Sequence, residues 1–156
     1  MELSDVETRL KNAEEKLRKT DLFLLENDVN ERSITHKLAQ YLQEEFRQEW
    51  HVDCEYNRVG TELMAKKLDL KAEPSCTDDT DAQTVYPDII VHHRGNENQN
   101  LLVIEAKKNS SRFGTSRDEE KLEAFGQQLG YEYCVLVTFD RDRASHRYIK
   151  PQGALT

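Results

Sequence analysis

Residues 85–107 read VYPDIIVHHRGNENQNLLVIEAK, with two apolar runs on either side of a polar stretch that contains a glycine. The runs at 85–93 and 100–107 have the length and the branched apolar content of β-strands. The stretch between them suits a hairpin connection. Because residues 101–104 are all apolar, the second strand is predicted to be buried on both faces, which requires helices on both sides of a sheet.

The flanking sequence supplies the helices and strands that such a sheet needs. Asn30 is a good N-cap ahead of an apolar helical face, and Gly130 is a good helix terminator. The last predicted strand is another continuous apolar run. Together these patterns predict an α/β fold. The predicted elements are a helix at 30–47, strands at 50–59, 85–93 and 100–107, a helix at 117–130 and a strand at 133–139.

Residues 1–29 are predicted to be an N-terminal helical extension of a single domain at 30–156. Ser4 followed by Glu7 is a capping-box pattern, which predicts that the helix begins there. Apolar residues recur at steps of four and three and form a narrow seam. The seam either docks on its own domain or pairs with a second copy of the chain. Its residues are Val6, Leu10, Ala13, Leu17 and Leu24.

Composition excludes several classes of protein. The chain has 156 residues, of which 33% are charged, and its mean hydropathy is -0.84, so we expect one domain and no membrane insertion. The N-terminus lacks the pattern of an export signal, which predicts a cytoplasmic protein. Three widely spaced cysteines fit neither a disulfide framework nor a zinc site. No phosphate-cradling glycine loop is present, so no nucleotide cofactor is expected.

Charge is unevenly distributed along the chain. The net charge is -8, yet residues 87–156 carry 10 acidic and 10 basic side chains, against 20 acidic and 12 basic ones in residues 1–86. An anion is therefore expected to dock on the C-terminal half. The turn-rich segment 59–84, which includes an acidic run, is predicted to be a mobile, solvated loop.

Charged residues end the central strand and point to a metal site. Glu105 and Lys107 project to the same face because side chains alternate along a strand. Asp88, on the preceding strand, can lie beside Glu105. Two adjacent carboxylates repel each other unless a cation lies between them. Since Mg²⁺ prefers oxygen ligands, we expect Asp88, Glu105 and the Ala106 carbonyl to bind Mg²⁺, with Mn²⁺ as a substitute, and Lys107 to act on the attacking water.

Pro87-Asp88 and Glu105-Ala106-Lys107, separated by sixteen residues, resemble the signature of the PD-(D/E)XK nuclease superfamily. The resemblance covers roughly residues 30–140. It implies a restriction-endonuclease-like core of order α-β-β-β-α-β, with a mixed central sheet flanked by helices, and Mg²⁺-dependent cleavage of DNA.

Many members of this superfamily also use a glutamate from the first core helix. Glu31 and Glu45 both lie on the inward stripe of the helix at 30–47. They are 14 residues apart, about 21 Å along a helix, so only one can approach the metal. Glu31 is preferred because its surroundings are similar to the opening of small resolvase-like and restriction-like members; surface charge is the alternative.

Several further residues are candidates for contact with substrate. Lys108, Arg112 and Arg117 follow the predicted metal site and are expected to bind nucleic-acid phosphates, in a flexible loop at 108–117. Gln127 and Tyr131 have the spacing of a motif in the RecB-like branch of the superfamily; chance spacing is the alternative. His92 and His93 either touch substrate or are solvated strand ends. Further cations follow the last predicted strand: Arg141, Arg143, Arg147 and Lys150.

Together these observations predict a Mg²⁺-dependent endonuclease that hydrolyses phosphodiester bonds in DNA, with a homodimer as one way to cut two strands. The first alternative is a catalytically inert module with the same fold that binds nucleic acid or protein. A small phosphodiesterase acting on nucleotides is the second, and a shallow salt dependence of binding to a long duplex would favour it.

Overall fold

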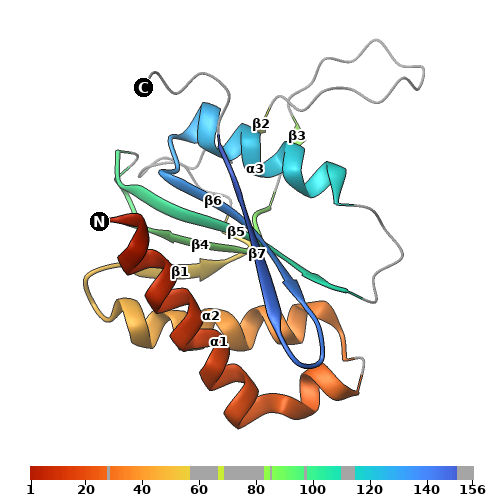
Figure 1. The fold of residues 1–156 in the computed structure, drawn as a ribbon. Coiled ribbons are helices and arrows are strands. Elements are labelled where there is room, and N and C mark those ends of the chain that lie inside the picture. The colour runs from red at the N-terminus through yellow and green to blue at the C-terminus, as the bar shows by residue number, and fades with distance from the viewer. Residues whose placement is uncertain are drawn as a thin grey trace, which may run out of the picture.

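The computed structural model describes residues 1–27, 29–56, 67–68, 83–84, 86–96, 98–109 and 115–150. Within these ranges the chain is an α/β protein with three helices, a mixed five-stranded sheet and a separate two-stranded ladder, shown in Figure 1. The elements are α1 (Leu3–Glu26), α2 (Glu31–Phe46), β1 (His51–Cys54), β2 (Lys67–Leu68), β3 (Gln83–Thr84), β4 (Ile89–His92), β5 (Asn100–Lys108), α3 (Ser116–Leu129), β6 (Tyr133–Phe139) and β7 (Ala144–Ile149).

The five-stranded sheet has the order β1-β4-β5-β6-β7. β5 is antiparallel to β4 and parallel to β6, so α3 forms the crossover that a parallel pair requires. The β4–β5 hairpin pairs Ile89 with Ile104. The next residues outward, Asp88 and Glu105, therefore meet where this pairing ends.

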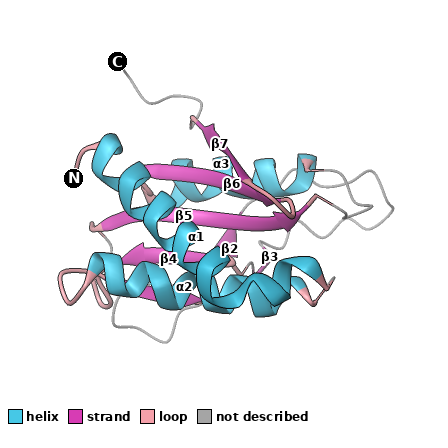
Figure 2. Cartoon of the chain, turned by 60° about the horizontal axis from the view of Figure 1, so that its bottom comes forward, coloured by secondary structure: helices cyan, strands magenta, loops and turns pink. Residues whose placement is uncertain are grey.

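Helices cover both faces of the sheet. Figure 2 shows α1 and α2 together on one face, and α3 lies on the other. Residues 101–104 of β5 are fully buried, with Leu102 and Ile104 packed toward α1 and α2 and Val103 toward α3. The predicted burial of this strand on both faces is confirmed.

Helix α1 docks on its own chain. Val6, Leu10 and Leu17 are completely buried in the core that α2 and the sheet share. The capping-box prediction is wrong, because the helix begins one residue earlier, with Glu2 as N-cap and no capping side chain. Ser4 therefore has helical backbone, and its carbonyl accepts a 2.8 Å hydrogen bond from the Thr8 hydroxyl.

The predicted caps of the other two helices are confirmed. The side chain of Asn30 accepts a 3.0 Å hydrogen bond from the backbone N–H of Arg32, as an N-cap should. Helix α3 ends at Gly130, whose φ of 67° is left-handed and favours glycine. These two caps mark the start of α2 and the end of α3 in the sequence.

Strand β7 was not predicted. It forms an edge of the sheet by pairing with β6, and the turn between them rests on α1. The Arg18 guanidinium donates to the carbonyl of Arg141 at 2.8 Å, and the His146 ring lies 2.6 Å from Glu14. The predicted loop 59–84 lies almost entirely outside the described residues; the exceptions are the short strands β2 and β3.

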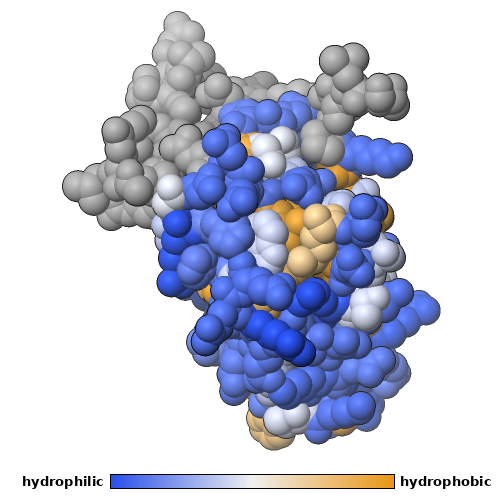
Figure 3. Space-filling model, turned by 90° about the vertical axis from the view of Figure 1, so that its left-hand side faces the viewer, coloured by the Kyte–Doolittle hydropathy of each residue, from blue (hydrophilic) through white to orange (hydrophobic). Residues whose placement is uncertain are grey.

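The described surface is polar. On the face drawn in Figure 3, hydrophilic residues predominate, and hydrophobic colour is limited to a central patch and a few smaller spots. Among the helices of the described chain, none is long and apolar enough to cross a membrane. Cys54 is exposed and Cys134 is buried, both as free thiols, while Cys76 lies outside the described residues.

Candidate metal and phosphodiester site

Asp88 lies directly before β4 and is anchored to β5. Its Oδ2 accepts a 2.8 Å hydrogen bond from the backbone N–H of Ala106, the residue between Glu105 and Lys107. Burial raises the pKa of Asp88, and the negative charges of Glu31 and Asp118 raise it further. The Ala106 hydrogen bond and the Lys121 charge act in the opposite direction. An acid whose proton affinity is raised by neighbouring acids is well suited to a cation.

Glu105 is the most deeply buried acid of the site, with 3% of the residue exposed. Burial first, and the charge of Asp88 second, raise its pKa to about 8. Its Oε2 accepts a 2.7 Å hydrogen bond from the Lys121 ammonium. Its Oε1 is buried and has no hydrogen-bond partner among the residues that the structure describes. A buried carboxylate oxygen without a partner is costly unless something binds it, so Oε1 is a natural ligand position.

Lys107 points to the same face of β5 as Glu105 and forms an ion pair with Asp118 on α3. Both side chains of this pair are largely buried, with 14% and 19% exposure. The predicted centre is therefore joined by two α3 residues that the sequence analysis did not single out, Asp118 and Lys121. A signal for them exists, because both lie on the helix stripe that includes the buried Leu122 and Phe125.

The structure separates the two candidate helix glutamates. Oε2 of Glu31 accepts a 3.0 Å hydrogen bond from the backbone N–H of Lys108, and the Glu31 charge raises the pKa of Asp88. Glu45 lies at the other end of α2, where its Oε2 accepts a 3.0 Å hydrogen bond from Asn12 of α1. Glu31 therefore borders the site and Glu45 supports the packing of α1 on α2.

The donors at the site fit a hard divalent cation. Asp88 and Glu105 supply carboxylate oxygens, and the hydrogen bond to Asp88 keeps the Ala106 peptide within reach. In the part of the chain that the structure describes, no group of three or more His, Cys, Asp or Glu side chains is arranged to hold a metal. A set of two carboxylates and one carbonyl is nevertheless sufficient for Mg²⁺, which usually keeps several waters and takes further oxygens from a phosphate.

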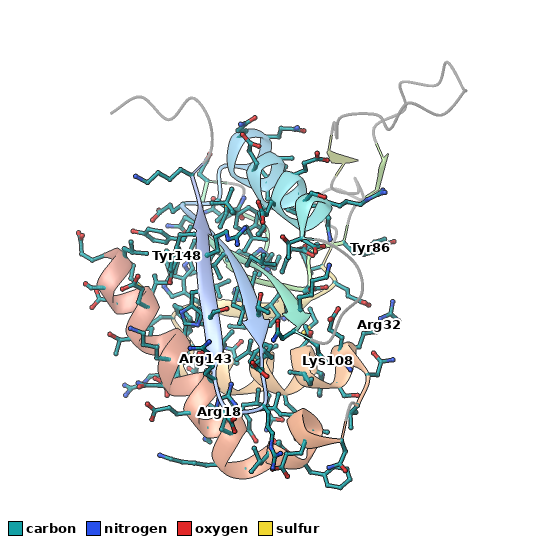
Figure 4. All side chains as sticks on the ribbon, turned by 45° about the vertical axis from the view of Figure 1, so that its right-hand side comes forward. Arg18, Arg32, Tyr86, Lys108, Arg143 and Tyr148 are labelled. Atoms are coloured by element: carbon teal, nitrogen blue, oxygen red, sulfur yellow. The ribbon has the colours of Figure 1, made fainter. Side chains whose placement is uncertain are left out.

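The predicted phosphate-binding residues have different positions. The Lys108 ammonium donates at 2.9 Å to the Val29 carbonyl, on the face of β5 opposite to Lys107. Arg117 is exposed at the start of α3, whereas Arg112 lies outside the described residues. Figure 4 shows Lys108, Arg32 and Tyr86 on the side of the molecule where α2 begins and β5 ends. Cationic and aromatic groups are thus present together on this side of the molecule.

The cations after β6 lie on other parts of the molecule. Arg143 is exposed in the β6–β7 turn, on the side of α1, as Figure 4 shows. Arg141 forms a 3.4 Å ion pair with Glu26, and Arg147 pairs with Glu119 of α3. Lys150 is exposed just after β7. Through its pair with Glu119, Arg147 contacts α3, the helix that carries Asp118 and Lys121.

The remaining candidates are not brought to the site. Gln127 is exposed and its side-chain amide donates at 3.1 Å to Glu123, while Tyr131 is buried against Phe125. His92 is buried at the far end of β4, where its ring lies 2.9 Å from Asp53. His92 is therefore not a solvated strand end, because Asp53 satisfies it within the protein.

His93 follows β4 and packs against Trp50, with the two ring centroids 4.3 Å apart. This contact belongs to the junction between α2 and β1, since Trp50 directly precedes β1. His93 is thus a packed residue at that end of the sheet.

Comparisons of the chain with protein-family models, with curated proteins and with solved structures find no match.

Proposed function

We propose that the chain is a Mg²⁺-dependent endonuclease that hydrolyses phosphodiester bonds in DNA. One observation carries the proposal. Asp88 and Glu105 come from neighbouring antiparallel strands and meet at the end of their pairing, with Lys107 on the same face and a buried Glu105 oxygen left without a partner among the described residues. This is the arrangement that a two-carboxylate metal centre needs.

The topology supports the proposal. The elements α2, β1, β4, β5, α3 and β6 follow one another in the order that the resemblance to the PD-(D/E)XK superfamily implies, apart from the short β2–β3 ladder, in a mixed sheet flanked by helices. We therefore propose a restriction-endonuclease-like fold, to which α1 and β7 are additions. The motif residues lie on the central antiparallel pair, as the resemblance implies.

Each residue of the proposed site has a role. Asp88 and Glu105 hold the metal, the Ala106 carbonyl completes the protein ligands, and Glu31 adds negative charge at the edge of the site. Mg²⁺, when bound, supplies a Lewis acid that polarises a phosphate and lowers the pKa of a bound water. Lys107 orients the attacking water and stabilises the charge that develops on the phosphate.

DNA is the proposed substrate because cations gather near the site although the whole chain is acidic. The exposed Arg117 begins the helix that carries Asp118 and Lys121, and the exposed Arg32 adjoins Glu31. Contacts of this kind position a phosphate backbone without reading its sequence. A homodimer is proposed as the form that cuts both strands of a duplex.

Cleavage assays test the proposal. Supercoiled plasmid, linear duplex, single-stranded and branched DNA are incubated with Mg²⁺ or Mn²⁺ and the wild type, Lys107→Ala or Glu105→Ala. Metal-dependent cutting by the wild type and its loss in both variants are expected. Lys37→Ala, which removes a partly exposed α2 lysine bonded to Gln40, is the matched control and should cut normally.

The same assay has an outcome that overturns the proposal. If no DNA is cut, and if calorimetric titration of the protein with Mg²⁺ or Mn²⁺ releases or absorbs no heat, a catalytically inert module that binds nucleic acid or protein is favoured instead.

A further inference from the structure

Lys121 already provides a positive charge where the metal is proposed to bind. Its ammonium donates to Glu105 Oε2 at 2.7 Å, and the two side chains are 17% and 4% exposed. The charge of Lys121 also acts on Asp88, whose pKa it lowers. One ammonium thus binds Glu105 and acts electrostatically on Asp88.

This ammonium satisfies the centre only in part. It binds one oxygen of Glu105, while the other, Oε1, is buried with no hydrogen-bond partner among the described residues. Asp118, one helical turn before Lys121 and on the same side of α3, holds Lys107 in the same manner. In the structure, each of the two site lysines is therefore paired with an acid.

We propose that Lys121 is a second lysine of the active site, which neutralises Glu105 before the metal binds and then moves to a phosphate of the nucleic acid. The inference rests on the proposed function. A divalent ion and an ammonium compete for the ionised form of Glu105, and the ion has the larger charge. The displaced lysine has a long flexible stem, so its ammonium can reach a nearby phosphate, which lysine binds as a point charge.

Lysine labelling followed by mass spectrometry reads the displacement directly in the wild-type protein. The reactivity of Lys121 toward an amine-acylating reagent is expected to rise several-fold when Mg²⁺ is added. Lys16 is the internal control, because its pair with Glu44 is solvent-exposed on both sides. Unchanged Lys121 labelling at a Mg²⁺ concentration that saturates the heat signal would overturn the inference and leave the proposed function standing.

A variant gives an independent readout. Lys121→Met removes the competing charge, so Ca²⁺ and Mn²⁺ are expected to bind roughly tenfold more tightly in calorimetry. In Ca²⁺, the salt slope of its binding to a DNA oligonucleotide should be smaller by about 1, the loss of one phosphate contact. Lys16→Met should change neither quantity.

The outcomes separate the two ideas. No metal binding by the wild type defeats the proposed function and this inference together. Metal binding by the wild type, with unchanged affinity and salt slope in Lys121→Met, defeats only the inference.

Discussion

The carboxylate of Asp88 accepts a hydrogen bond from the backbone N–H of Ala106, so one side chain ties β4 to β5 and supplies charge to the proposed metal centre. The tie lies just beyond the last paired residues, Ile89 and Ile104, where the strands would otherwise separate. Structural and functional roles of Asp88 can be separated by substitution.

Asp88→Asn keeps an oxygen that accepts the Ala106 hydrogen bond but lacks the charge. We expect urea unfolding in EDTA to change little, and calorimetric Mn²⁺ binding to be lost. Asp88→Ala should lose metal binding too and also about 1–2 kcal/mol of stability, because the Ala106 N–H is left without a partner. Metal affinity at the wild-type level in Asp88→Asn would remove Asp88 from the proposed centre.

Glu31→Gln and Glu45→Gln form a matched pair on one helix. Glu31 acts on Asp88 electrostatically, whereas Glu45 contacts α1. We expect Mn²⁺ affinity to fall by roughly tenfold in Glu31→Gln. Glu45→Gln should bind the ion as the wild type does. Equal effects of the two substitutions on the calorimetric affinity would contradict the assignment of Glu31 to the border of the site.

Glu105 makes the stability of the metal-free protein depend on pH. Its pKa is about 8 in the folded state against an ordinary 4.5, so between these values the folded state holds the proton more tightly than the unfolded state. Folding stability should therefore be greatest, as far as Glu105 contributes, below about pH 4.5 and should fall as the pH rises toward 8.

Glu105→Gln tests this dependence. The variant should be more stable than the wild type at pH 8.5 by on the order of 2 kcal/mol and about equal to it at pH 5. The measurement is urea unfolding in EDTA at both values. The difference in the free energy of unfolding between Glu105→Gln and the wild type should become smaller when Mg²⁺ is present, because the ion stabilises only the wild type. A difference that does not vary with pH would show that Glu105 is charged in both states.

Leu10→Ala tests how firmly α1 belongs to the core. Leu10 is fully buried, so its truncation should cost about 2–4 kcal/mol in urea unfolding. Phe23→Ala, also on α1, is the control; Phe23 is 68% exposed, and its loss should change stability by less than about 0.5 kcal/mol. A small effect of Leu10→Ala would mean that α1 frays from the domain.

The parts of the fold that were predicted have local signals. The apolar run at 101–104, the Asn30 cap and the Gly130 terminator each lie in a few consecutive residues, so the elements they mark are found without knowing the rest of the chain. β7 has no such signal. Its sequence ASHRYI mixes charged, polar and apolar residues, and its strand conformation comes from pairing with β6. Tertiary contact with β6, and not local sequence, therefore determines that these residues form a strand.

The residues of the candidate site also fall into those that a local sequence pattern predicted and those that it did not. Asp88, Glu105 and Lys107 were predicted together because strand alternation and hairpin register place them, and both are readable from sequence. Alternation also explains the position of Lys108, which must point away from Lys107. Asp118 and Lys121 were missed because the helix stripe that they share with Leu122 and Phe125 shows which side of α3 faces the sheet, but not which strand residues it meets.

The contacts of α1 have a consequence for the order of events during synthesis. Arg18 binds the carbonyls of Asp140 and Arg141, and Glu14 binds His146, so the packing of α1 is completed by the β6–β7 hairpin, which is translated after it. Partners so far apart in sequence form slowly, because a long loop must close first. Until β7 has been translated, these contacts of α1 with the β6–β7 hairpin cannot form. The part of the chain from α2 to α3, which carries the charged centre, is therefore translated before α1 has made these contacts.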